Sequence, residues 1–176
     1  MTRGHIYLIG MPGSEKTTLG QKLAAALALP FADMDARVEA LNGMPIPRIF
    51  AERGEGAFRQ MESEALARCA REPAQVIATG GGAVLREANV ALMRATGVTL
   101  WIDRPLERIL DDVRQDTRPL LAGDAAGRLR ALYAERRELY RSAALYQLDN
   151  QGTWEQALQS ALALLKSMYS VQFTLF

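Results

Sequence analysis

A lysine, two threonines and two glycines near the start of the chain form a pattern that suits phosphate binding. The segment Gly10-Met-Pro-Gly-Ser-Glu-Lys-Thr17 follows a short apolar run and opens an amphipathic stretch, which is the strand-to-helix context of a P-loop. In such a loop, backbone N–H groups at the start of the helix bind phosphate oxygens. Lys16 would reach the β- and γ-phosphates of a nucleotide, and the Thr17 hydroxyl would ligate Mg²⁺. The candidate nucleotide-binding residues are Gly13, Ser14, Glu15, Lys16, Thr17 and Thr18.

One residue of this loop departs from the P-loop pattern. Glycine is expected immediately before the lysine, because it lets the backbone approach the phosphates without a Cβ, and this chain has Glu15 there. A carboxylate ~5 Å from one phosphate charge would repel it by roughly 3 kcal/mol at an effective dielectric of about 20. A side chain turned to solvent would weaken that repulsion, and an acidic residue in the first turn suits the helix dipole. Taken alone, the segment is either a phosphate site or an ordinary loop-to-helix turn.

Two carboxylates follow the second apolar run, in Phe31-Ala-Asp-Met-Asp35. Side chains two residues apart on an extended segment point to the same side, so both carboxylates would face one crevice. One of them would lie near the metal while the other binds a substrate hydroxyl. The alternative is that Asp35 only caps a helix over residues 36–41.

A glycine triplet and three arginines complete the set of candidate residues. Gly80, Gly81 and Gly82 follow the third apolar run, where they permit close approach of the backbone to a ligand. Arginine binds carboxylate and phosphate with a planar fork of donors. For any single arginine, however, a solvated helix face is the commoner explanation. The arginines are Arg59, at the start of a long helical pattern, Arg118, in Thr117-Arg-Pro-Leu-Leu-Ala-Gly123, and Arg136, in Glu135-Arg-Arg-Glu-Leu-Tyr-Arg141.

The elements that must position these residues alternate between short apolar runs and amphipathic stretches, which predicts a three-layer α/β/α fold with a parallel sheet of about five strands. Such sheets bind ligands at the carboxyl ends of their strands. The predicted strands are His5–Ile9, Pro30–Asp33, Val76–Thr79, Val98–Asp103 and Tyr146–Asp149. The predicted helices are Thr17–Leu29, Ala36–Leu41, Ile46–Arg53, Gly56–Arg71, Glu87–Ala95, Leu106–Arg114, Ala126–Arg141 and Trp154–Met168.

Composition excludes several classes of protein. With 176 residues, 49% of them hydrophobic, the chain can bury a sizeable core and is not a disordered protein. A formal net charge of +1 and scattered aromatic residues give no sign of nucleic-acid binding. The apolar run at residues 5–9 is too short for a signal peptide or a membrane span, and the single cysteine, Cys69, allows no internal disulfide. We expect a cytoplasmic protein with no membrane partner. The apolar residues of the tail, 167–176, alternate with polar ones and predict an edge strand or a docked tail.

The order of the motifs resembles the shikimate kinase family from about residue 6 to about residue 165. The P-loop, Asp-x-Asp, Phe-Arg, Gly-Gly-Gly, Arg-Pro-Leu-Leu and Arg-x-x-Leu-Tyr occur in family order and with family-like spacing. The resemblance implies a P-loop kinase of nucleoside-monophosphate-kinase-like architecture, with residues 1–176 as one kinase domain. It implies a lid at about 114–127 and a substrate-binding helical region at about 35–62. It further implies transfer of the γ-phosphoryl group of ATP, the co-substrate, to the 3-hydroxyl of shikimate, with Mg²⁺ as cofactor, by a monomer.

The resemblance also implies a role for each candidate residue. Asp35, Lys16 and Arg118 would be catalytic: Asp35 would orient or deprotonate the attacking hydroxyl, and Arg118 would reach the transferring phosphate from the lid. Thr17 would ligate Mg²⁺, and Asp33 would act in the outer shell of the ion. The shikimate-binding residues would be Asp35, Arg59, Gly80, Gly81, Gly82 and Arg136.

Two alternatives remain open at this point. The chain could be a family member that binds shikimate but is impaired in nucleotide binding by Glu15. It could also be another small P-loop kinase that acts on a sugar acid or a nucleoside monophosphate. A further departure is that arginine often follows the last strand in this family, where this chain has Leu148-Asp-Asn-Gln-Gly-Thr153. Adenine contacts would then depend on backbone or on Arg114.

Overall fold

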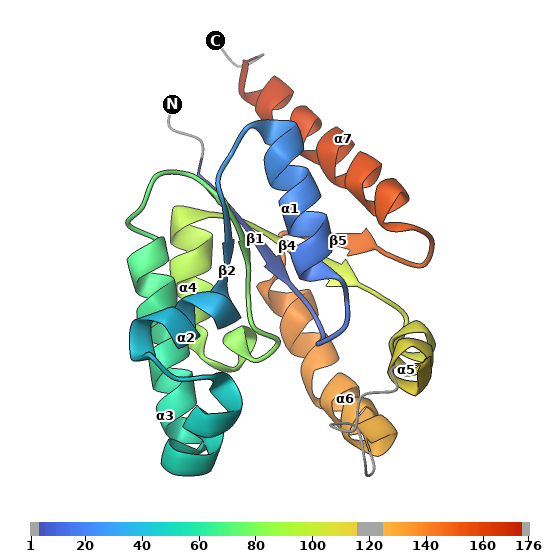
Figure 1. Ribbon diagram of the computed structural model, residues 1–176. Coiled ribbons are helices and arrows are strands. Elements are labelled where there is room, and N and C mark those ends of the chain that lie inside the picture. Colours follow the sequence, from blue (N-terminus) through green and yellow to red (C-terminus); the bar gives the residue numbers. More distant parts are fainter. Residues whose placement is uncertain (1–3, 116–124, 174–176) are drawn as a thin grey trace.

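The computed structural model describes residues 4–115 and 125–173 and has a three-layer α/β/α fold. All strand pairings are parallel, and the strand order is β2-β3-β1-β4-β5 (Figure 1). The strands are β1 (His5–Ile9), β2 (Phe31–Asp33), β3 (Val76–Ala78), β4 (Gly97–Asp103) and β5 (Tyr146–Asp149). The helices are α1 (Lys16–Leu27), α2 (Met34–Asn42), α3 (Ile46–Cys69), the short 3₁₀ helix η1 (Ala83–Leu85), α4 (Glu87–Thr96), α5 (Leu106–Gln115), α6 (Ala125–Ala143) and α7 (Trp154–Phe173).

Alternate residues of the strands feed two separate cores. Tyr7 and Ile9 of β1 pack with Trp101 in a cluster that α3, α4 and α6 cover. Ile6 and Leu8, which point the other way, belong to a second cluster covered by α1 and α7. Since both faces of the sheet are buried, the strands are continuous apolar runs, as is usual for parallel sheets.

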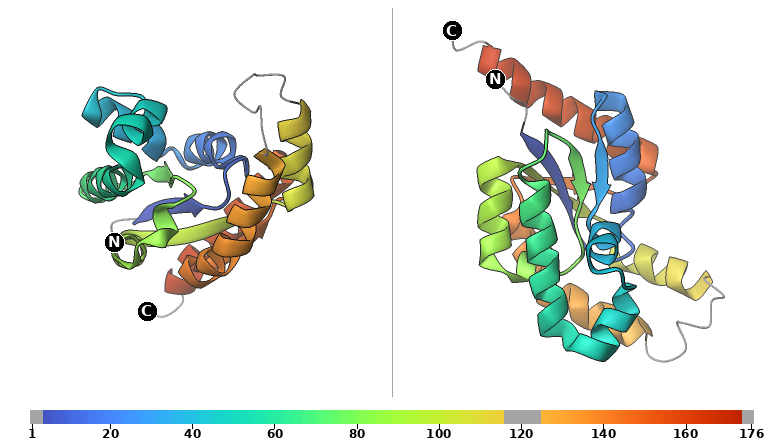
Figure 2. Two further views of the ribbon diagram at one scale, coloured as in Figure 1. Left: turned by 90° about the horizontal axis from the view of Figure 1, so that it is seen from below. Right: turned by 60° about the vertical axis from the view of Figure 1, so that its left-hand side comes forward.

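The carboxyl ends of the strands open between two groups of helices. Seen from below, α2 and α3 lie on one side of these ends, and α5 and α6 lie on the other (Figure 2). The segments that follow β1, β2 and β3 all begin at this edge of the sheet. The topology therefore brings together the P-loop, the Asp-x-Asp segment and the glycine triplet.

The predicted strands all exist, within one or two residues of the expected bounds, but two other expectations need correction. Residues 167–173 of the tail do not form an edge strand: α7 continues to Phe173, because residues 154–173 contain neither proline nor glycine to stop it. Asp33 and Asp35 do not share an extended segment, because α2 begins at Met34. The predicted break between two helices near Gly54 is present as a kink within α3, where Gly54 has φ 76°. Most of the predicted lid, residues 116–124, lies outside the described residues.

In the described part of the chain, no helix is both long enough and apolar enough to cross a membrane.

Candidate active site

The loop between β1 and α1 has the backbone form of a phosphate-binding loop. Gly10 and Gly13 have φ of 149° and 78°, values that side chains other than hydrogen rarely allow. A Cβ at Gly10 would lie 2.7 Å from the Ile102 carbonyl oxygen, so the close packing of the loop against β4 also requires glycine. The loop leads directly into α1, whose first N–H groups therefore lie at its rim.

Lys16 lies buried beneath this loop. Its ammonium donates hydrogen bonds to the carbonyl oxygens of Gly10 at 2.9 Å and Met11 at 2.7 Å. Burial lowers the pKa of Lys16 to about 8, although the nearby carboxylates of Asp35 and Asp33 oppose the shift. The Lys16 ammonium is therefore placed to bind an anion in the loop, and a bound anion would raise the pKa of Lys16 again.

Two oxygen atoms that could bind a metal ion lie close together beside Lys16, one from Thr17 and one from Asp33. The Thr17 hydroxyl donates to Asp33 Oδ2 at 2.7 Å, across the gap between α1 and β2. Asp33 is also the N-cap of α2, because its Oδ1 accepts hydrogen bonds from the N–H groups of Asp35 and Ala36. The capping role that the sequence suggested for Asp35 therefore belongs to Asp33.

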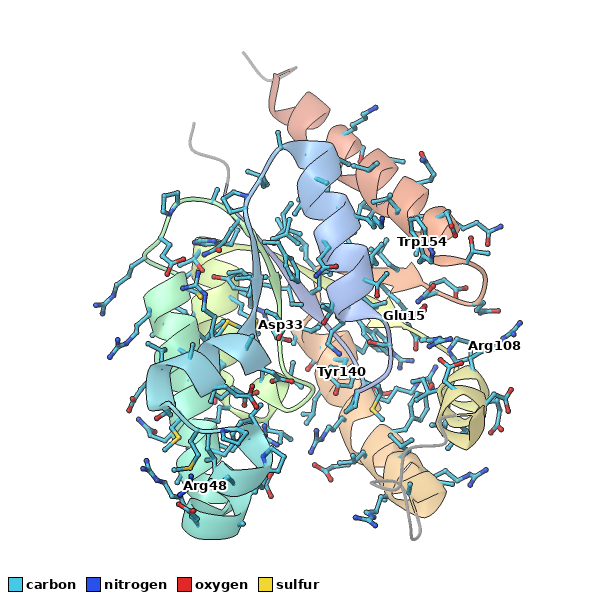
Figure 3. All side chains as sticks on the ribbon, in the orientation of Figure 1. Glu15, Asp33, Arg48, Arg108, Tyr140 and Trp154 are labelled. Atoms are coloured by element: carbon cyan, nitrogen blue, oxygen red, sulfur yellow. The ribbon has the colours of Figure 1, made fainter. Side chains whose placement is uncertain are left out.

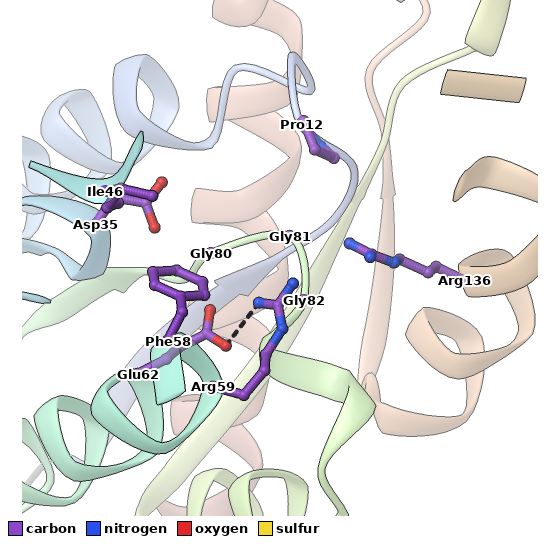
Figure 4. Close-up of a pocket in the computed structure, with 10 residues that line it drawn as sticks. All are labelled: Pro12, Asp35, Ile46, Phe58, Arg59, Glu62, Gly80, Gly81, Gly82 and Arg136. Carbon is purple, nitrogen blue, oxygen red and sulfur yellow. Dashed lines mark hydrogen bonds and ion pairs between the residues drawn. The ribbon is translucent and has the colours of Figure 1, made fainter. Parts of the chain in front are cut away.

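A cavity of about 140 Å³ lies beside the loop and collects the remaining predicted residues (Figure 4). Its size suits a small metabolite rather than a polymer. Charged side chains enter it from three directions: Asp35 from α2, Arg59 and Glu62 from α3, and Arg136 from α6. The lining residues are Pro12, Asp35, Ile46, Phe58, Arg59, Glu62, Gly80, Gly81, Gly82 and Arg136.

Arg59 is held in the cavity by two carboxylates of its own helix. It pairs with Glu62 at 2.9 Å, one turn later, and with the more exposed Glu55 at 3.1 Å. Glu62 is almost fully buried, and burial raises its pKa against the opposing effect of the Arg59 guanidinium. Arg59 thus has a fixed guanidinium that faces the glycine triplet.

Asp35 sits in the first turn of α2 and presents its carboxylate to the same cavity. Burial raises the pKa of Asp35, and the neighbouring Asp33 raises it further, while Lys16 and Arg59 act in the opposite direction. A carboxylate with a raised pKa is a better proton acceptor than an ordinary aspartate.

The glycine triplet forms the floor between these charged groups. A Cβ at Gly80 or Gly82 would lie closer than 3.0 Å to Glu62 or to the Arg59 guanidinium, respectively, so only glycine leaves these side chains in place. Tyr140 donates a hydrogen bond to the Gly81 carbonyl oxygen at 2.5 Å and so fixes the middle of the triplet from α6. Burial raises the pKa of Tyr140 to about 12, which keeps the phenol protonated as that donor.

Glu15 does not point toward Lys16. Its carboxylate accepts a hydrogen bond from Asn150 Nδ2 at 3.1 Å and lies 3.9 Å from Nε of Arg104. In Figure 3, Glu15 lies on the side of α1 that faces α5, whereas Asp33 lies on the side of α2 and α3.

Comparisons with known proteins agree with this arrangement. A family model described as "Shikimate kinase" matches residues 12–166. The chain belongs to the shikimate kinase family. A shikimate kinase of Symbiobacterium thermophilum is 49% identical over 144 residues, which cover 80% of this chain and 83% of that protein.

Solved structures give the same answer for the fold. The shikimate kinase of Acinetobacter baumannii in complex with shikimate has a TM-score of 0.84 and 34% sequence identity, over 96% of this chain and 94% of that one. A gluconokinase of Sinorhizobium meliloti has a TM-score of 0.65 at 17% identity, covering 98% of each chain, and shares the fold alone. The family assignment confirms the P-loop kinase architecture expected from the motifs.

Within the shikimate kinase site, the structure brings together most of the residues singled out from the sequence. Lys16, Thr17 and Asp33 form one group, and Asp35, Arg59, Arg136 and the glycine triplet form the other. Arg118 lies outside the described residues. Sequence reasoning missed Glu62, Tyr140, Arg104 and Asn150; a signal existed for Glu62, because it lies three residues after Arg59 on one helix face.

Proposed function

We propose that this protein transfers the γ-phosphoryl group of ATP to the 3-hydroxyl of shikimate, giving shikimate 3-phosphate and ADP. The observation that carries the proposal is the cavity itself. Two arginines and an aspartate converge on a glycine floor directly beside a phosphate-binding loop, and Pro12 of that loop lines the cavity. A small ring that carries one carboxylate and several hydroxyls needs hydrogen-bond donors for the carboxylate and hydrogen-bond acceptors for the hydroxyls.

On the substrate side, Arg59 and Arg136 bind the shikimate carboxylate. They reach the cavity from α3 and α6, so they can grip the carboxylate from two directions. The backbone of Gly80, Gly81 and Gly82 contacts the ring, since glycine has no Cβ to keep the ring away, and a Cβ at Gly80 or Gly82 would also displace Glu62 or Arg59.

On the nucleotide side, backbone N–H groups of the loop and of the start of α1, including those of residues 13–18, bind the phosphates. Lys16 neutralises charge on the β- and γ-phosphates. Arg118 would add positive charge from a lid at about 114–127, which remains a prediction from the sequence.

The cofactor is Mg²⁺, and the Thr17 hydroxyl with the Asp33 carboxylate would hold it. Hydroxyl and carboxylate oxygens are the ligands that Mg²⁺ prefers, and the hydrogen bond from the Thr17 hydroxyl to Asp33, at 2.7 Å, supports a place for Asp33 beside an ion bound at Thr17. Within the described residues, no cluster of three or more His, Cys, Asp or Glu forms a metal cage, which fits an ion bound largely through substrate phosphates. When bound, the ion neutralises charge on the phosphates.

The chemical step depends on Asp35. Its carboxylate accepts the proton of the attacking hydroxyl as the oxygen–phosphorus bond forms and the bond from the γ-phosphorus to the bridging oxygen breaks. ADP leaves with the electron pair of that bond, and Lys16 stabilises the negative charge on its β-phosphate. The raised pKa of Asp35 suits this proton transfer.

The predicted substrate residues of a single chain are enough to line the cavity, so we propose that the protein acts as a monomer. We also propose a cytoplasmic location for the protein, because its co-substrate ATP is supplied there.

ADP release from Mg-ATP tests the proposal directly. We expect release that depends on shikimate, little release with gluconate or a nucleoside monophosphate, and a loss of roughly 10²- to 10⁴-fold in kcat for Asp35→Asn. Gluconate-dependent release without a response to shikimate would identify a sugar-acid kinase instead. A chain that binds shikimate but releases ADP only after the Glu15→Gly substitution would be a nucleotide-impaired family member.

A further inference from the structure

Glu15 occupies a backbone position that disfavours it. Its φ of 66° and ψ of 24° place it in the left-handed region, and it is the N-cap residue of α1 without a side-chain capping bond. Its side chain therefore does not satisfy any N–H group of the first turn, and all of these groups stay available to an anion.

The sheet order separates the Glu15 carboxylate from the catalytic groups. Lys16 and Thr17 interact with Asp33, the last residue of β2, and with Asp35, which follows it, on one side of β1. The Glu15 carboxylate instead contacts Arg104, which follows β4, and Asn150, which follows β5, on the other side of β1.

Arg104 is tied to three groups at once. It donates to the Gly13 carbonyl oxygen at 2.9 Å and to Asp112 at 2.6 Å, and it faces Glu15. Its side chain is only 13% exposed, so solvent screens its attraction for Glu15 less than at an open surface.

Asn150 is buried and held in a single orientation. Its backbone N–H donates to the Asp103 carbonyl oxygen, and its Nδ2 faces both the Ser14 carbonyl oxygen at 3.4 Å and Glu15 at 3.1 Å. A flipped amide would place Oδ1 against these two acceptors, so only the observed orientation is favourable.

From these contacts we propose that Arg104 and Asn150 are positioning residues that hold the Glu15 carboxylate outside the phosphate-binding face of the loop. This pairing keeps the loop competent for ATP although it lacks the usual glycine. The inference rests on the proposed ATP site and adds two residues to it that act through Glu15 rather than through the nucleotide.

A double-mutant cycle tests the proposal. Arg104→Gln is made with Glu15 in place and again in the Glu15→Gly background, and Mg-ADP binding is measured by titration calorimetry. We expect Arg104→Gln to weaken Mg-ADP binding about tenfold with Glu15 in place, and less than threefold in the Glu15→Gly background. The KM for ATP should follow the same pattern while the KM for shikimate changes less than twofold.

Two further variants sharpen the result. Arg104→Lys retains the charge and should recover at least half of the lost affinity. If Arg104→Gln does not fold, Asn150→Ala, which removes the other partner of Glu15, is made in both backgrounds and decides the coupling. Asp112→Asn is the matched control, because it removes the other carboxylate partner of Arg104 and should leave Mg-ADP affinity unchanged.

Equal losses in both backgrounds would overturn the proposal, since Arg104 would then act on the loop or the nucleotide without Glu15. The same holds if Glu15→Gly alone weakens Mg-ADP binding more than threefold. Failure of every variant, including Glu15→Gly, to bind Mg-ADP would overturn the ATP site and this inference together, whereas binding without coupling would overturn the inference alone.

Discussion

Gly82→Ala isolates the contribution of the Arg59 guanidinium to shikimate binding. A Cβ at Gly82 would come closer than 3.0 Å to three atoms of that guanidinium, a separation that Cβ atoms essentially never show. The clashing group is the end of a flexible side chain, so we expect the guanidinium to swing away while the backbone stays in place.

The expected loss of shikimate affinity in Gly82→Ala follows from the hydrogen bonds that Arg59 would lose. A hydrogen bond to a charged group contributes about 1.5–3 kcal/mol, so losing the Arg59 contact with the substrate carboxylate weakens shikimate binding roughly 10- to 150-fold. Arg59 also leaves Glu62, whose buried carboxylate loses its 2.9 Å partner. That loss lowers the free energy of unfolding by about 1–3 kcal/mol.

Shikimate titration calorimetry and thermal unfolding together check this prediction. Gly56→Ala is the matched control, because a Cβ there meets nothing within 4 Å. It should leave shikimate affinity unchanged and stabilise α3 by about 0.5–1 kcal/mol. A Gly82→Ala protein that binds shikimate within threefold of the parent would refute the placement of Arg59 on the substrate carboxylate.

Three further predictions follow from the site. At pH 8, where Lys16 with a pKa of about 8 is roughly half protonated, ADP binding should take up roughly half a proton, because the phosphates raise that pKa. Calorimetry in buffers of different ionisation enthalpy measures this uptake, which should vanish at pH 6.5 and in Lys16→Met. Tyr140→Phe should lower the free energy of unfolding by about 1–3 kcal/mol in urea titrations, because the Gly81 carbonyl loses its donor. Asp33→Asn should raise the Mg²⁺ concentration needed for half-maximal activity without melting α2, whereas Asp33→Ala should also lose about 1 kcal/mol of stability with the cap; equal stability of the two variants would contradict the capping role.

Most of the fold could be predicted from the sequence because local patterns determine it. The strands are continuous apolar runs, which can be recognised without knowing which strands lie beside them. The P-loop motif predicts the strand before it and the helix after it. The tail was different: its alternation spans too few residues to outweigh the helix that precedes it, and α7 runs on to Phe173. The position of Asp35 in a helix also escaped prediction, because the cap at Asp33 starts α2 earlier than the apolar pattern does.

Apart from Glu62, which lies one turn after Arg59, the supporting residues of the site could not be predicted, because their contacts join distant parts of the chain. Tyr140 reaches Gly81 across 59 residues, and Asn150 reaches Glu15 across 135. Neither residue type suggests such a partner by itself, and only the strand order brings β5 close to the loop after β1. The residues that we expect to contact ligand are recognisable from motifs, whereas those that hold them in place depend on tertiary structure.

Glu15 shows why a departure from a motif has to be weighed against its tertiary neighbours. A phosphate charge ~5 Å away would repel the carboxylate by roughly 3 kcal/mol, whereas a partly exposed ion pair such as the one with Arg104, at 3.9 Å, contributes about 0–1 kcal/mol. The pairing with Arg104 therefore acts by fixing where the Glu15 carboxylate lies, rather than by cancelling a repulsion of that size. The left-handed backbone adds a cost of roughly 1–2 kcal/mol that the pairing does not remove, and this cost falls on folding rather than on ATP binding. Replacing the missing glycine should therefore change stability more than it changes affinity for the nucleotide.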